Sequence, residues 1–438
     1  MRTPQYAMSI FKGRREKLAN HLKDSALILA ANPEVIRNGD VHYPFRQNSN
    51  MFYLTGFEEP NSALIFRPGK NPETVLFVMS KDPAQETWTG FRYGVEGAKR
   101  YFEVDEVYSI DSVQDELPKL LSDVDQIYYS LFSNTNFDTI LMDIINDLTW
   151  SRSRSNRGNL PIIDPCAMLG EMRLRKSNVE VEWHRRACEI SAEAHIEVMK
   201  TIRPGINERA LHGVFLRSIM ERGCAREGYG AIVAGGENAT TLHYEFNDQV
   251  CKDGDLLLLD AGAEYNYFSG DITRVFPVNG RFSDTQKRIY QKMLNVQKDL
   301  VSLVKPGTSR EALQTETVSR LTELMIDEKL LKGRKDDLIE KKEYERFYMH
   351  RVSHWLGMEV HDAGTTLVNG EPRVIEPGFV LTIEPGLYIS KDAPGVPDEL
   401  RGIGIRIEDD VLVTESGHEV LSSKCPKEIA DIEAVMRH

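Results

Sequence analysis

The stretch LLLLDAGAEYNYFSGDITRVF, residues Leu256–Phe276, decides how the second half of this chain folds. Its four consecutive leucines predict a strand that is buried on both faces. The strand ends in Asp260, and Asp271 follows after a predicted tight turn. An unpaired carboxylate is strongly disfavoured in apolar surroundings, so we expect another group to compensate these two charges.

The register of a hairpin would bring the two aspartates together. If Tyr265 and Asn266 form a two-residue turn, counting outward places Asp260 directly opposite Asp271. Opposed residues on antiparallel strands have Cβ atoms about 4.5 to 5.5 Å apart. Like charges at that distance need a shared proton or a cation between them. The alternative is that one aspartate turns to solvent and the pair has no function.

The length of the chain predicts its number of domains, and its net charge limits the kinds of partner it can bind. A chain of 438 residues exceeds the usual size of one hydrophobic core, so we expect two domains. The formal net charge is −13, which argues against binding a phosphate backbone. We therefore expect no nucleic-acid partner.

Cysteine usage and hydropathy predict a cytoplasmic, soluble protein. The cysteines are odd in number and form no CxxC pair, which favours reduced thiols over a disulfide framework. These residues are Cys166, Cys188, Cys224, Cys251 and Cys425. The N-terminus lacks an apolar core of signal-peptide length, and no apolar run approaches the roughly 20 residues that span a bilayer. We expect no membrane contact.

The first third of the chain alternates strand-like and helical runs, which predicts an α/β domain with a mixed sheet. The predicted strands are SALILAAN from Ser25, MFYLTGF from Met51, SALIFRP from Ser62 and TVLFVMS from Thr74, and DSVQDELPKLLSD is a predicted helix. The polar segment 151–158, SRSRSNRG, predicts a surface loop near the end of this domain.

A second domain is expected from about residue 173. Ser177 and Glu180 have the spacing of a capping box, and a helical pattern follows to Ile202. Ser283 and Gln286 repeat that signature before a second long helix. We therefore predict an N-terminal domain over residues 1–172 and a C-terminal domain over residues 173–438.

The C-terminal domain contains an internal repeat. RPGINERAL from Arg203 matches KPGTSREAL from Lys305, and GDLLLLDAG from Gly254 matches GFVLTIEPG from Gly378. Two short matches in the same order suggest a duplicated helix-helix-strand unit. The duplication makes Asp260 and Glu384 equivalent positions in two halves.

Three further stretches place polar side chains among apolar neighbours or glycines. They are HRVSHWLGMEVHDAG from His350, LTIEPGLY from Leu381 and GIRIEDD from Gly404, and they contribute His354, Glu384 and Glu408. Arg351 stands where HExxH would have glutamate, so this is not a zincin helix. With the two aspartates, four carboxylates and one imidazole suit a hard or borderline divalent ion, Mn²⁺ first. Four negative charges would balance two such ions, which can activate a shared water.

The ordered set DAGAEYNYFSGDITRVFPVNG, SHWLGMEVHD, TIEPGLY and GIRIEDD resembles the pita-bread metallopeptidases, and within them the aminopeptidase P (Xaa-Pro aminopeptidase) family. RNGDVHYPFRQNSNMFYLTGFEEPNSALIF is also similar to the N-terminal domain of that family, so the resemblance covers nearly the whole chain. It implies a creatinase-like α/β N-terminal domain, followed by an α+β pita-bread catalytic domain with two pseudo-equivalent halves.

The resemblance also implies the site. Asp260, Asp271, His354, Glu384 and Glu408 would bind two divalent ions per subunit, Mn²⁺ first with Co²⁺ and Zn²⁺ as alternatives. Asp271 and Glu408 would bridge the ions, with Asp260 on one and His354 and Glu384 on the other. The remaining implied catalytic residues, which line the pocket or contact substrate, are His243, His350, His361 and Arg406. Each of these four alone has an alternative interpretation as a packed or surface side chain.

The implied reaction releases the first residue of a peptide whose second residue is proline. A hydroxide bridging the metals would attack the carbonyl, and Glu384 would handle the proton as general base and then acid. The alternative enzyme is prolidase, which cleaves only dipeptides. The alternative that is not an enzyme is a peptide-binding or chaperone module on the same fold.

Assembly is the last expectation from the resemblance. A neighbouring subunit's N-terminal domain would help to close the active site, and Asp40, Arg46 and Trp88 lie in the corresponding region. The alternative interpretation is two surface charges and a half-buried aromatic. We therefore expect a homo-oligomer, a tetramer or a dimer.

Overall fold

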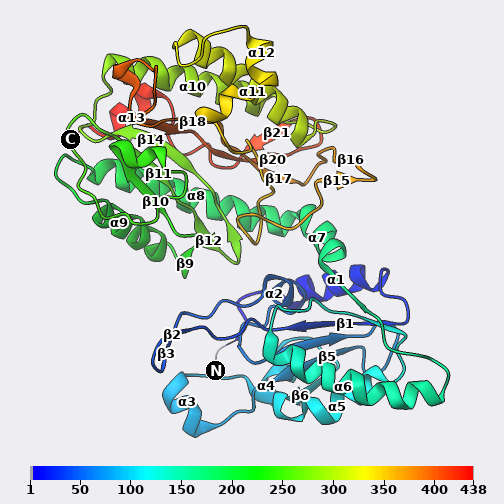
Figure 1. The fold of residues 1–438 in the computed structure, drawn as a ribbon. Helices are drawn as coiled ribbons and strands as arrows, with labels where there is room; N and C mark the ends of the chain where they lie inside the picture. The colour runs from blue at the N-terminus through cyan, green and yellow to red at the C-terminus, as the bar shows by residue number, and fades with distance from the viewer. Residues whose placement is uncertain (1–2, 438) are drawn as a thin grey trace. The chain divides into compact units, whose positions relative to one another are not determined.

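The computed structural model describes residues 3–437. The chain divides into two compact units, Met1–Met172 and Arg173–His438, and each contains a hydrophobic core of its own. Figure 1 shows helices on both faces of one sheet in the first unit, and several short sheets with long helices in the second. The predicted combination of an α/β domain with an α+β domain is confirmed.

A six-stranded mixed sheet forms the first unit, in the order β6-β5-β4-β1-β7-β8. The central strand β1 is antiparallel to β4 and parallel to β7. The strands are β1 (Ser25–Ala30), β4 (Ala63–Phe66), β5 (Thr74–Val78), β6 (Glu106–Ser109), β7 (Gln126–Tyr128) and β8 (Ile162–Ile163). A separate exposed hairpin pairs β2 (Ile36–Asn38) with β3 (Val41–His42).

Helices cover both faces of this sheet. Figure 1 shows α1 and α2 on one face and α5 and α6 on the other. Apolar side chains of α5 and α6 share one buried cluster with alternate residues of β1 and β4, because successive strand residues point to opposite faces. The helices are α1 (Met8–Ala19), α2 (Ser49–Thr55), α3 (Pro83–Thr89), α4 (Gly94–Tyr101), α5 (Val113–Leu121) and α6 (Thr135–Arg154).

Two predictions for the first unit were wrong. MFYLTGF is not a strand but most of α2: the Asn48 side chain caps its first turn, and Gly56 ends it at φ 66°. A short buried apolar run does not distinguish strand from helix by periodicity. The predicted loop over 151–158 is helical through Arg154, because Arg152 is buried and its guanidinium donates to the carbonyls of Val124 and Gly158.

The second unit is built from short antiparallel sheets. Three strands pair as β10-β11-β14, three as β13-β12-β9, three as β17-β20-β21, and two pairs are β15-β16 and β18-β19. Their bounds are β9 (Arg226–Glu227), β10 (Ile232–Gly235), β11 (Leu256–Asp260), β12 (Ala263–Tyr265), β13 (Phe268–Ser269), β14 (Thr273–Pro277), β15 (Leu367–Val368), β16 (Glu371–Pro372), β17 (Val380–Ile383), β18 (Gly386–Ile389), β19 (Ile403–Arg406), β20 (Asp409–Val413) and β21 (His418–Val420).

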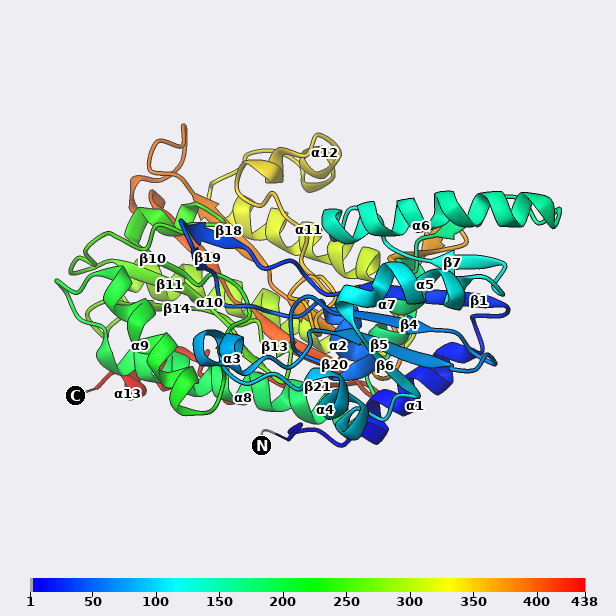
Figure 2. The ribbon, with the colours of Figure 1, turned by 90° about the horizontal axis from the view of Figure 1, so that it is seen from below.

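Long helices pack in pairs against these sheets. Figures 1 and 2 both show α8 beside α9 and α10 beside α11, and α8 also packs on β12 and β13. Both predicted capping boxes, at Ser177 and at Ser283, are present. The helices are α7 (Cys166–Leu174), α8 (Asn178–Thr201), α9 (Glu208–Glu221), α10 (Asp284–Ser302), α11 (Arg310–Asp327), α12 (Lys335–Glu340) and α13 (Ile429–Val435).

Backbone hydrogen bonds confirm the two equivalent halves. The first half has an isolated bridge between Asn207 and Val250, and the second has one between Ser309 and Val374. In both halves the glycine of the Pro-Gly pair donates to the carbonyl of the residue that follows the bridge: Gly205 to Cys251, and Gly307 to Ile375. The sequence repeat therefore corresponds to a repeated tertiary arrangement.

The predicted turn of the central hairpin was one residue too early in the sequence, so the predicted pairing of the strands was wrong by two residues. Tyr265 pairs with Phe268, so the turn is Asn266 and Tyr267, which have φ values of 51° and 70°. This turn type requires positive φ at both central residues, and asparagine tolerates that conformation well. Asp260 consequently pairs with Thr273 rather than with Asp271.

The five cysteines are free, and all but Cys166 are buried. Within residues 3–437, the helices do not include one with the length and apolar character needed to cross a bilayer.

Candidate active site

A cavity of about 590 Å³ opens between the two halves of the second unit. All nine side chains that the sequence predicts for the site line it: Asp260, Asp271, His354, Glu384, Glu408, His243, His350, His361 and Arg406. Residues far apart in the chain therefore meet around one space.

Strand ends position the acidic residues. Asp260 is the last residue of β11, and Glu384 directly follows β17, the equivalent strand of the second half. Asp271 lies between β13 and β14, and Glu408 lies between β19 and β20. Because the strands carry these residues from both halves to one place, the carboxylates converge although the direct pairing expected from the hairpin does not occur.

Asp271, His354 and Glu408 form a cluster that could hold a metal ion. Each offers a ligand atom within 4.8 Å of the others. His354 Nε2 lies 3.3 Å from Asp271 Oδ2 and 3.7 Å from Glu384 Oε1. His354 Nδ1 donates to the carbonyl of Trp355 at 3.0 Å, which leaves Nε2 to face the carboxylates. A metal-binding histidine takes this orientation.

A tyrosine joins the two aspartates. The Tyr229 hydroxyl lies 2.5 Å from Asp260 Oδ1 and 2.6 Å from Asp271 Oδ1. A phenol has one proton and donates to only one of them, so the second close contact requires a proton or a cation on the carboxylates. On the other side, the Thr273 hydroxyl donates to Glu408 Oε2 at 2.5 Å.

Burial and the charges of neighbouring groups shift the pKa values of the clustered side chains. Burial raises the pKa of Glu384 to about 7 although His354 opposes the rise. Burial and the other carboxylates raise the pKa of Glu408 well above its usual range, and burial raises that of Asp260. Burial alone would lower the pKa of His354, but Asp271 and Glu384 raise it to about 9. Divalent cations would relieve the same repulsion, and an oxygen-rich set with one imidazole fits them.

A buried arginine links this cluster to a histidine. Arg406 donates to Asp260 Oδ2 at 2.6 Å and to the Tyr388 hydroxyl at 2.8 Å. Tyr388 in turn lies 2.9 Å from His350 Nε2, while His350 Nδ1 donates to the carbonyl of Arg351 at 2.8 Å. Burial lowers the pKa of His350 to about 4, so a neutral ring accepts from Tyr388.

Two more histidines lie at the open side of the cavity. His243 and His361 are both exposed. The His361 ring stands edge-on to His354 with centroids 4.4 Å apart, and burial, followed by His354, lowers its pKa. Imidazoles at the mouth of a cavity can donate a hydrogen bond to a substrate carbonyl.

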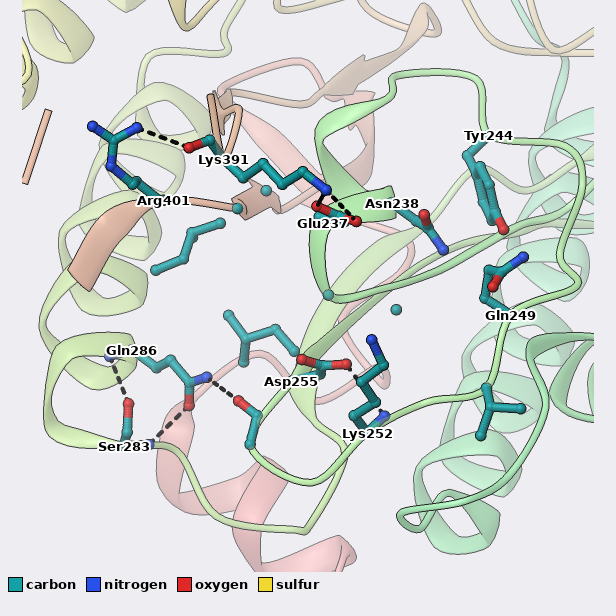
Figure 3. A pocket seen from close by; sticks show the side chains of 18 of the residues that line it. Glu237, Asn238, Tyr244, Gln249, Lys252, Asp255, Ser283, Gln286, Lys391 and Arg401 are labelled. Carbon is teal, nitrogen blue, oxygen red and sulfur yellow. Dashed lines mark hydrogen bonds and ion pairs between the residues drawn. The ribbon is translucent and has the colours of Figure 1, made fainter. Parts of the chain in front are cut away.

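A larger cavity of about 840 Å³ lies where β10 ends and β11 begins, away from Asp260 at the other end of β11 (Figure 3). Its charged side chains are largely paired with one another or with backbone: Lys391 with Glu237, and Asp255 with the amide of Lys252. It contains neither a predicted site residue nor the carboxylate cluster. The smaller cavity is therefore the candidate active site.

The three residues expected to act across subunits lie in the first unit. Asp40 is exposed at the turn between β2 and β3. Arg46 is partly buried and donates to the Ser49 hydroxyl at 3.1 Å. Trp88, in α3, is 87% exposed rather than half-buried.

Sequence reasoning missed Tyr229, Thr273, Tyr388 and Arg310 as residues of this site. Tyr388 lies four residues after Glu384 and Thr273 two after Asp271, so proximity to a predicted ligand was a usable signal. Tyr229 lies 31 residues before Asp260 in a stretch without a motif, and only the tertiary structure brings it to the aspartates.

Comparisons with known proteins agree with this geometry. Residues 182–415 match the model of metallopeptidase family M24, and residues 11–128 match that of the aminopeptidase P N-terminal domain. An Xaa-Pro aminopeptidase of Haemophilus influenzae is 43% identical over 97% of this chain and 96% of its own.

Solved structures resemble the chain over its whole length. An aminopeptidase from Pseudomonas aeruginosa aligns with a TM-score of 0.95 at 42% identity, covering 99% of both chains. Zinc-substituted aminopeptidase P of Escherichia coli, in complex with product, aligns with a TM-score of 0.94 at 39% identity over 98% of both chains. The chain therefore belongs to metallopeptidase family M24, in the branch that carries the aminopeptidase P N-terminal domain.

Proposed function

We propose that the chain is a metal-dependent Xaa-Pro aminopeptidase, which releases the N-terminal residue from peptides with proline in second position. The observation that carries the proposal is the convergence of four carboxylates and His354 around one open cavity. The names of full-length relatives support the proline preference and favour the aminopeptidase over a prolidase.

In this proposal two divalent ions bind at each site, through the side chains of Asp260, Asp271, His354, Glu384 and Glu408. The donor set favours Mn²⁺, with Co²⁺ and Zn²⁺ as alternatives, and the zinc-substituted relative supports the latter. Such ions supply Lewis acidity, which lowers the pKa of water toward neutrality and polarises a carbonyl.

Side chains of the protein transfer the proton and bind the substrate in this proposal. Glu384 would accept a proton and return it to the leaving amine, because it is a partly buried carboxylate that lines the cavity beside the other predicted metal ligands. His243 and His361 stand at the open side, where they can donate to the substrate's carbonyl groups. Arg406 holds Asp260 and, through Tyr388, His350, so these residues keep fixed positions when a peptide enters.

The rest of the proposal concerns direction and assembly. The substrate's amino group would lie near Asp260, which restricts attack to the first bond of a chain. Asp40, Arg46 and Trp88 would help to close the site of a neighbouring subunit in a dimer or tetramer. Light scattering after size-exclusion chromatography tests the assembly, and cell fractionation tests the proposed cytoplasmic location.

A substrate series tests the activity. Purified protein, stripped of metal and reloaded with Mn²⁺, Co²⁺ or Zn²⁺, is given Xaa-Pro-Xaa, Xaa-Pro and Xaa-Ala-Xaa peptides, and released amino acids are quantified. We expect cleavage of the first peptide and much slower cleavage of the third. Metal analysis should give two ions per chain.

The alternatives give different outcomes. Cleavage restricted to the dipeptide identifies a prolidase. No cleavage with any metal, combined with measurable peptide binding, favours a non-catalytic binding module. Full activity of an Asp271→Ala variant without bound metal contradicts the proposed mechanism.

A further inference from the structure

We propose that Arg310 binds a carboxylate on the leaving part of the peptide and thereby sets a preference for substrates that carry one there. The inference rests on the proposed function, because it assigns a specificity residue to that reaction. The carboxylate belongs either to the C-terminus of a short peptide or to an acidic side chain of a longer one.

Arg310 is the first residue of α11 and lines the candidate active site. One terminal nitrogen donates to the carbonyl of Ser353, and the guanidinium lies 5.0 Å from the Trp355 ring centroid, which holds it in place. Its buried Nε lacks a hydrogen-bond partner within residues 3–437, and no described carboxylate lies within ion-pair distance of it. A guanidinium that is held in place without a carboxylate partner can bind an anion from a ligand.

Helix stability does not explain this cation, and the two acids whose charges favour it, Glu311 and Glu384, are not within ion-pair distance of it. A positive charge at a helix N-terminus opposes the helix dipole. Arg351 lies close enough that, after burial, its charge is the next cause of the lowered pKa of Arg310, which is about 10. Arg351 is itself paired with Glu311, so the acid nearest in sequence to Arg310 is already engaged. Arg310 stays charged at neutral pH, and an anion from outside would stabilise it.

Two arginines, Arg310 and Arg351, line the same cavity as the carboxylate cluster. In the proposed function the amino group of the peptide lies near Asp260, so the residues that follow the first one extend through the cavity away from that group. A carboxylate on those residues can then contact the arginines.

A second pocket of about 170 Å³ shares Arg310 and Arg351 with the active-site cavity. The other residues that line it are Glu311, Trp355, Thr366, Pro372 and Arg373. Residues of the peptide that follow the scissile bond have room there, next to a guanidinium that can bind a carboxylate by two parallel hydrogen bonds.

Matched peptide pairs test the proposal. With Mn²⁺-loaded enzyme, kcat/KM is measured for Xaa-Pro-Ala as free acid and as amide, and for pentapeptide amides with Asp or Asn at position three or four. We expect wild-type enzyme to favour at least one carboxylate peptide by roughly tenfold or more. The first pair reports on the terminal carboxylate, and the others report on a side chain.

Variants assign the preference to one residue. In Arg310→Met the acid-to-amide ratio should fall to about 1, whereas Arg310→Lys should keep part of it. Arg351→Met should lower the ratio less, because that side chain is paired with Glu311. Arg217→Gln, on the exposed surface of α9, should leave activity and ratio unchanged. Circular dichroism and metal content verify that each variant is folded.

Binding separates this inference from the proposed function. Calorimetry with metal-free protein compares the acid and amide forms of one tripeptide, and we expect tighter binding of the acid in wild type but not in Arg310→Met. If wild-type protein cleaves no Xaa-Pro peptide, the proposed function fails and binding alone decides the inference. A ratio near 1 in wild type, or one that survives in Arg310→Met, overturns the inference.

Discussion

At the residue scale, three of the four carboxylates of the site have a hydroxyl neighbour that fixes their orientation. Tyr229 contacts Asp260 and Asp271, and Thr273 donates to Glu408. These contacts reduce the rotational freedom of the acids but do not remove their mutual repulsion, which adds to the effect of burial in raising the pKa of Glu408. The protein therefore holds the acids in place at a cost in stability that bound cations would reduce.

We predict that Tyr229→Phe weakens metal binding by roughly 10 to 100-fold, because residues that orient metal ligands have effects of that size. Calorimetric titration of metal-free protein with Mn²⁺ measures the change. Tyr344→Phe, on a 3₁₀ turn outside the cavity, is the matched control and should titrate like wild type. Equal affinities for Tyr229→Phe and wild type would contradict the role of the phenol.

At the scale of elements, the hairpin from β11 to β14 depends on close backbone contact between two glycines. A Cβ at Gly262 would lie 1.7 Å from the carbonyl oxygen of Gly270. Alanine at position 262 therefore forces the chain segments after Asp260 and before Asp271 apart. The two glycines allow both aspartates to approach the cavity from one hairpin.

We predict that Gly262→Ala lowers the free energy of unfolding by about 2 to 4 kcal/mol, the range of severe overpacking. Urea denaturation followed by circular dichroism measures it. Gly213→Ala is the control: this glycine lies in α9 with open space around its Cβ position, and alanine there should stabilise by about 0.5 to 1 kcal/mol. Unchanged stability of Gly262→Ala would show that the hairpin can move apart freely.

A buried ion-pair network joins the start of the second unit to the loop that carries His361. Asp362 pairs with Arg173 at 2.5 Å and with Lys176 at 3.0 Å. Burial would raise the pKa of Asp362, but the two cations hold it below its usual value. Its stabilising contribution is therefore complete above the unfolded pKa of about 3.9 and declines as the pH falls through the lower folded pKa.

We predict that Asp362→Asn costs about 3 to 5 kcal/mol of unfolding free energy at pH 7, because it leaves two buried cations without their carboxylate. The difference from wild type should narrow as the pH falls below the unfolded pKa of about 3.9, where the carboxyl group of the unfolded chain takes up a proton first. Urea titrations at pH 7 and near pH 3 check both parts. A difference that is the same at both pH values would contradict the linkage.

At the scale of the whole molecule, two equivalent halves place their strand ends around one cavity. The first half supplies Asp260 and Asp271, and the second supplies His354, Glu384 and Glu408. Neither half contains all five of the proposed metal ligands, so the site exists only when both halves are packed together. Metal binding and folding of the second unit are consequently linked.

We predict that removing metal lowers the melting temperature by roughly 5 °C or more, because ligand at 100 times its dissociation constant stabilises by about 2.7 kcal/mol. Differential scanning calorimetry with Mn²⁺ and with EDTA measures the shift. Asp271→Ala should melt at the same temperature in both conditions. A wild-type protein insensitive to EDTA would contradict metal binding at this site.

The sequence determined the local elements and the set of polar residues. The strand Leu256–Asp260, the capping boxes at Ser177 and Ser283, and the repeat that equates Asp260 with Glu384 follow from hydrophobic patterning and short motifs, which act over a few residues. The tertiary structure alone decided the hairpin register, the helix at Met51 and the contacts of Arg406, Tyr229 and Arg310. Those contacts join residues as much as 146 positions apart, and their energy comes from burial and charge in the folded cavity, for which the local sequence carries no signal.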